Sequence, residues 1–94
     1  MTAGHTSREQ ELRRRLAGLV HERRQAEAEA DRLRERARLP GADPDLNATA
    51  DRWAVRAGEL DADIEAVRAQ LRAEEAATAR VRADDALGPQ EGGG

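Results

Sequence analysis

Apolar side chains recur along this chain at alternating spacings of four and three residues, in two runs separated by a Pro/Gly segment. The first run comprises Leu12, Leu16, Leu19, Arg23, Ala26, Ala30, Leu33 and Ala37. The second comprises Leu46, Ala50, Trp53, Ala57, Leu60, Ile64, Val67 and Leu71. A repeat of about 3.5 residues is typical of a coiled-coil seam. The two runs therefore predict two long helices, each with one narrow apolar stripe.

Helix-start and helix-stop signals predict the bounds of these helices. Thr6 and Glu9 have the spacing of a capping box, which predicts a helix over 7–38. The segment Leu39-Pro40-Gly41 ends that helix and makes 39–43 a turn. Asp43 suits the N-cap of a second helix over 44–86. We expect the hairpin to occupy 7–87, with flexible tails at 1–6 and 88–94, and a break near Gly58 is left open.

A turn this short makes the two helices antiparallel neighbours. Folding the chain at the turn places Ala30 opposite Trp53 and Leu19 opposite Ile64. Charge favours the same pairing, because residues 7–39 carry ten Arg and seven acids (net +3) and residues 43–87 carry six Arg and eleven acids (net −5). We therefore predict an all-α fold, an antiparallel two-helix coiled-coil hairpin. Because its core is thin, we expect it to dimerise into a four-helix bundle.

Composition narrows the range of functions. The chain has 94 residues and no Cys, which excludes disulfides and a thiol nucleophile. His5 and His21 have no third ligand at a spacing that suits zinc, so we expect neither metal nor cofactor. The net charge of −3 gives no reason to expect a nucleic-acid partner. We see no signal peptide and no run of about 20 apolar residues, and so expect no membrane association and a cytoplasmic location.

Arg23 interrupts the apolar series at a position opposite Leu60. A buried arginine is costly unless it is paired with an acid. One hypothesis is that Arg23 reaches Glu59 or Asp63 at the edge of the seam and so specifies register or partner. The other hypothesis is that Arg23 binds an anion inside a helical bundle.

A resemblance bears on the second hypothesis. The stretch 19–44 begins with Leu19-Val20-His21-Glu22-Arg23-Arg24 and ends with Leu39-Pro40-Gly41-Ala42-Asp43-Pro44. It resembles the first helix and following loop of the small all-helical chorismate mutases. The resemblance implies an intertwined helical dimer that rearranges chorismate to prephenate without a cofactor. The resemblance implies that Arg23 corresponds to the active-site arginine in the middle of the first helix of that family. Arg34 would then lie where the family has a lysine, and Asp43 where it has the aspartate of the loop. The Arg-Glu pair that follows the loop in that family is Leu46-Asn47 here.

Two functional hypotheses follow from these patterns. The favoured one is a small coiled-coil protein–protein interaction module, a dimerising scaffold, adaptor or regulator without catalytic activity. Its partner would be a second copy or another helical protein. The interface residues would be Leu12, Leu16, Leu19, Arg23, Leu33, Trp53, Leu60, Ile64, Val67 and Leu71. The alternative is an enzyme-like bundle resembling a chorismate mutase, with Arg23, Arg34 and Asp43 as its site residues.

Overall fold

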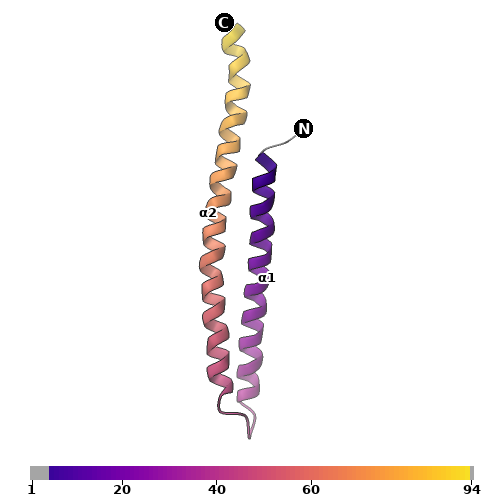
Figure 1. Ribbon diagram of the computed structural model, residues 1–94, viewed down its shortest axis with the longest axis vertical. Coiled ribbons are helices and arrows are strands. Elements are labelled where there is room, and N and C mark those ends of the chain that lie inside the picture. Colours follow the sequence, from indigo (N-terminus) through magenta and orange to yellow (C-terminus); the bar gives the residue numbers. More distant parts are fainter. Residues whose placement is uncertain (1–4, 94) are drawn as a thin grey trace.

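Two helices make up the described part of the chain. The computed structural model describes the backbone of residues 5–93 and the side chains of residues 7–85. Helix α1 spans His5–Ala37 and helix α2 spans Leu46–Gly93. They lie side by side and antiparallel, joined by one turn at the end opposite both termini (Figure 1). No strand occurs within residues 5–93, so the predicted all-α hairpin is confirmed.

The turn between the helices is held by its own backbone and by Asp43. Gly41 has a φ of 75°, in the left-handed region that disfavours residues with a Cβ. Asp43 Oδ1 accepts a hydrogen bond from the N–H of Asp45 at 2.8 Å, and its carbonyl accepts one from Leu46 at 3.2 Å. Asp43 therefore caps α2 in the way that the sequence predicts, with regular helix starting at Leu46.

The start of α1 differs from the predicted capping box. Because α1 begins at His5, Thr6 lies inside the helix rather than before it. Glu9 is only 7% exposed, and its carboxylate accepts a hydrogen bond from the Thr78 hydroxyl at 2.8 Å. Glu9 therefore joins the two helices instead of capping one. Residues 1–4 and 94 of the predicted tails lie outside the described residues.

Helix α2 is longer than its partner. It passes unbroken through Gly58 and continues beyond the predicted end at residue 86 to Gly93. It has 48 residues against 33 in α1, so its C-terminal part projects past the start of α1 (Figure 1). The side chains over 79–85 are all exposed, so α1 does not cover this part of the helix.

The core is a single seam between the helices. Its buried apolar residues are Leu12, Ala26, Ala30, Leu33, Ala50, Ala57, Leu60, Ile64 and Val67, all at predicted seam positions. Leu16, Leu19 and Leu71 are only half-buried. Trp53 departs from the prediction, because it is 40% exposed although it was expected in the seam opposite Ala30. Its large ring does not fit between helices that meet through alanines, and it lies at the border of the seam instead.

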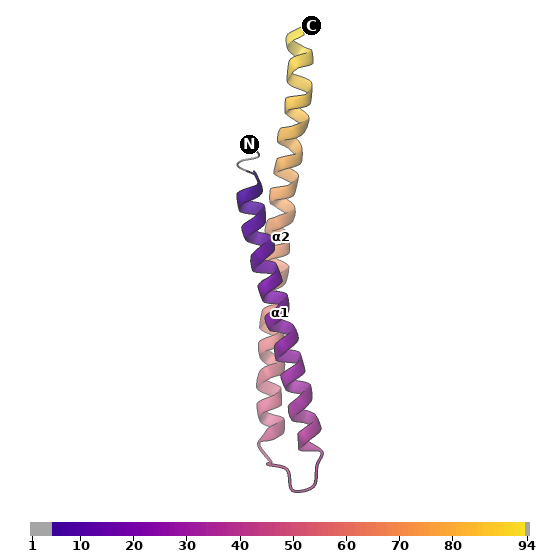
Figure 2. The ribbon, with the colours of Figure 1, turned by 90° about the vertical axis from the view of Figure 1, so that its right-hand side faces the viewer.

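The hairpin is flat and one helix layer thick, with extents of 82 × 20 × 13 Å. In the view turned by 90°, α1 passes in front of α2 and changes sides along the length of the molecule (Figure 2). The helices therefore wind around one another, as a repeat of about 3.5 residues requires. A ribbon of this shape has two broad faces, and neither is covered by a further element of the described chain.

Candidate functional site

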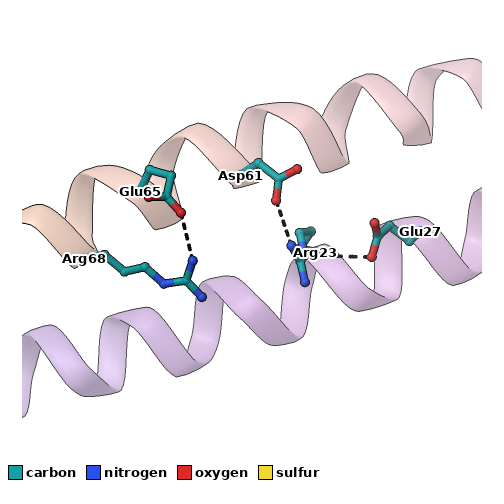
Figure 3. Close-up of polar contacts among 5 residues, drawn as sticks. All are labelled: Arg23, Glu27, Asp61, Glu65 and Arg68. Carbon is teal, nitrogen blue, oxygen red and sulfur yellow. Dashed lines mark hydrogen bonds and ion pairs between the residues drawn. The ribbon is translucent and has the colours of Figure 1, made fainter.

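Arg23 joins the two helices near the middle of the seam (Figure 3). Its Nη1 donates a hydrogen bond to Asp61 Oδ1 at 2.9 Å, and its Nε lies 3.8 Å from Glu27 Oε1. The hydrogen bond to Asp61 raises the pKa of Arg23, and burial opposes this shift. The acid that Arg23 reaches across the seam is Asp61, whereas Glu59 and Asp63 were the predicted candidates. The structure thus pairs this arginine within the hairpin.

One polar atom of this cluster is left without a partner. The Nε of Arg23 is buried and makes no hydrogen bond, since the Glu27 carboxylate is too far away to accept one. A buried donor without an acceptor is destabilising. The Arg23 side chain is nevertheless 33% exposed, so its terminal nitrogens reach water as well as Asp61. Arg23 therefore links the two helices by an ion pair, but it occupies a seam position where an apolar side chain would leave no polar atom unpaired.

Ion pairs close one broad face of the hairpin, which we call the bridge face. Three arginines of α1 contact acids of α2 there, in the pairs Arg13–Glu75 at 3.0 Å, Arg23–Asp61 at 2.9 Å and Arg34–Asp51 at 3.2 Å. Positions 13, 20, 27 and 34 repeat every seven residues and so share one side of the helix. A groove of about 520 Å³ on this face is lined by Glu27, Ala30, Asp31, Arg34, Ala54, Ala57, Gly58 and Asp61. It contains no large apolar side chain.

The opposite face, which we call the Trp face, has a different character. Its groove of about 390 Å³ is lined from α1 by Glu22, Gln25, Ala26, Ala28, Glu29 and Arg32, and from α2 by Trp53, Arg56 and Leu60. Among the side chains of residues 7–85, one ion pair joins the helices on this side, between Arg56 and Glu22 at 3.5 Å. The indole of Trp53, the sole aromatic residue of the chain, is therefore presented at an open groove.

The residues implied by the resemblance to chorismate mutases do not converge. Arg23 and Arg34 pair with different acids of α2, Asp61 and Asp51, and Asp43 lies in the turn as a helix cap. Only Arg34 of the three lines a described groove. Within the hairpin, two of the positive charges that such an enzyme needs for substrate carboxylates are thus already compensated by acids.

Sequence patterns did not reveal the Glu9–Thr78 contact. Both residues lie at positions that continue the alternating spacing of four and three, Glu9 before Leu12 and Thr78 beyond Leu71, but both are polar and so do not belong to the apolar runs. The contact could have been predicted from the positions of these residues in the repeat, but not from their residue types. The contact extends the seam by about one turn toward the start of α1.

Comparisons with known proteins identify no relative, since no family model, no curated protein and no solved structure matches the chain. Among the described residues, no helix is both long and apolar enough to cross a membrane. The same part of the chain holds no group of three or more His, Cys, Asp or Glu residues that could bind a metal ion.

Proposed function

We propose that this chain is a helical interaction module that completes its core by packing against a second copy of itself, giving a four-helix bundle. The supporting observation is the incomplete seam of the hairpin. Leu16, Leu19 and Leu71 occupy seam positions yet stay half-buried, because a two-helix ribbon has no element that covers them from above or below. Apolar burial is the main favourable term in folding, and a second hairpin would supply more of it.

The energetics of a lone hairpin favour the same proposal. Within the part of the chain whose side chains are described, five large apolar side chains are buried, namely Leu12, Leu33, Leu60, Ile64 and Val67. The remaining buried apolar residues are alanines, which contribute little area each. The ion pairs that join the helices are at least one-third exposed on both sides, and such pairs contribute about 0–1 kcal/mol each. A structure of this kind gains stability from association, as small scaffolds commonly do.

Sedimentation equilibrium over a concentration series tests the proposal. We expect the mass to rise from the 10.3 kDa of one chain toward twice that value as concentration increases. Thermal unfolding followed by circular dichroism at several concentrations gives a second readout, because association to a folded dimer makes the melting temperature rise with concentration. A mass of one chain throughout, with a melting temperature independent of concentration, would refute self-association.

A further inference from the structure

Small residues bring the two helices close together at the middle of the hairpin. Ala26 and Ala30 of α1 and Ala50 and Ala57 of α2 are all buried, with exposed fractions of 7% or less. Because these side chains end at Cβ, they do not reach out to either broad face. A groove is left on each face here, with Ala26 in the lining of the Trp-face groove and Ala30 and Ala57 in the lining of the bridge-face groove.

The other residues that line the two grooves make them chemically different. Glu27, Asp31 and Asp61 give the groove of the bridge face an excess of acids over its single arginine, Arg34. Arg23 compensates Asp61, and Glu27 and Asp31 still outnumber Arg34 in this lining, so the groove is the more acidic of the two. The groove of the Trp face carries two acids, Glu22 and Glu29, and two arginines, Arg32 and Arg56, so its charges balance.

A balanced charge pattern suits a surface that meets a copy of itself. In a twofold dimer the same patch contributes to both sides, so an arginine of one copy can face an acid of the other. The pairs now formed on this face are Arg32–Glu29 at 2.8 Å and Arg56–Glu22 at 3.5 Å. Their side chains are between 32% and 65% exposed, so they can exchange partners at small cost. A polyanion such as a nucleic acid would instead need an excess of positive charge.

The surface also supplies an aromatic anchor and room beside it. Trp53 is 40% exposed, and tryptophans at the centre of an interface are the side chains that most often dominate its binding energy. Gly18, Gln25 and Arg32 are spaced by seven residues and so follow one line along α1. A Cβ added at Gly18 would meet nothing within 4 Å, so a neighbouring helix has space along that line.

From these observations we infer that the Trp face is the surface on which a second copy of this chain docks. Trp53 of each copy packs in the groove of the other, next to Ala26 and Ala28, and the charges around it pair across the twofold axis. The bridge faces then point outward to solvent. This inference rests on the proposed function and adds to it the surface and the anchor residue.

The test combines the intrinsic fluorescence of Trp53 with two substitutions. The chain has one Trp and no Tyr, so its emission reports on Trp53 alone. We expect the emission to shift to shorter wavelength with the same concentration midpoint as the rise in mass. Trp53→Ala should weaken the dimer by roughly 30-fold or more, in line with the loss of a central aromatic anchor. Val55→Ala, at an exposed residue outside both grooves, should leave the dimer unchanged.

A second pair of variants leaves Trp53 in place, so that a loss of the dimer cannot result from a hairpin that fails to fold without its tryptophan. Ala28→Arg adds a bulky charged side chain at an exposed position of the groove, and Ala17→Arg makes the same change at an exposed position outside both grooves. Ala28→Arg should abolish the dimer with the helical circular dichroism signal retained, and Ala17→Arg should not. If the wild type dimerises but Ala28→Arg and Trp53→Ala dimerise equally well, the inference is wrong and the proposed function stands. If the wild type stays monomeric, both fail.

Discussion

Replacing Gly58 with alanine is expected to stabilise the hairpin, in spite of the position of Gly58 at the edge of the seam. Glycine within a helix costs free energy because the unfolded chain loses more conformational freedom there than at alanine. A Cβ built on Gly58 meets no heavy atom within 4 Å apart from its own stretch of helix, and its φ is not in the left-handed region. The substitution therefore removes the penalty and introduces no clash.

The expected gain for Gly58→Ala is about 1 kcal/mol in the free energy of unfolding. In a chain of this size that corresponds to a rise of roughly 4–8 °C in melting temperature. Gly41→Ala provides the matched comparison, because the same change is made in the turn. There the φ of 75° is unfavourable for alanine, so we expect a loss of about 1–2 kcal/mol.

Urea and thermal unfolding, followed by circular dichroism at one fixed protein concentration, give both values. Holding the concentration fixed keeps any contribution from association constant. The reasoning requires opposite signs at the two glycines. A neutral or destabilising Gly58→Ala would mean that α2 does not run as regular helix through this position, and a stabilising Gly41→Ala would mean that the turn is built differently.

Two further substitutions test the seam. Leu60→Ala should lower the free energy of unfolding by about 2–5 kcal/mol in a urea titration. Leu60 is 1% exposed and packs with Ala26 and Ala57, which are too small to fill the resulting cavity. Val81→Ala, at a residue that is 59% exposed, should have almost no effect in the same titration. Arg23→Leu should raise the melting temperature, since it removes a buried Nε without an acceptor and leaves Asp61 on the surface, where water can solvate it. Arg68→Leu is the control, because Arg68 pairs with Glu65 of its own helix at 2.8 Å (Figure 3). A lower melting temperature for Arg23→Leu alone would show that the ion pair with Asp61 stabilises the hairpin by more than the unpaired Nε of Arg23 destabilises it.

The predicted elements that agree with the structure depend on contacts that are close in sequence. The spacing of Leu12, Leu33, Leu60 and Ile64 fixes which side of each helix is apolar, and that side must turn toward the partner helix to leave water. Asp43 caps α2 through an N–H two residues away, so its neighbours in the chain are sufficient to predict it.

The details of the candidate site depend on the alignment of one helix against the other. A shift of a single turn changes which acid an arginine can reach, and Arg23 accordingly contacts Asp61 rather than Glu59 or Asp63. Glu9 illustrates the same point, since its capping-box spacing is a local signal but its carboxylate is satisfied by Thr78 on the other helix. Long side chains have several staggered rotamers, and only the surrounding helix selects one.

By itself, the sequence determined the class of the fold, the apolar residues that are buried in the seam and the antiparallel order of the helices, because each follows from a periodicity or a turn signal carried by neighbouring residues. Only the tertiary structure decided that Trp53 is left at an open groove while three arginines close the opposite face. The physical reason is the close approach of the helices at Ala26, Ala30, Ala50 and Ala57, which leaves no room for an indole between them.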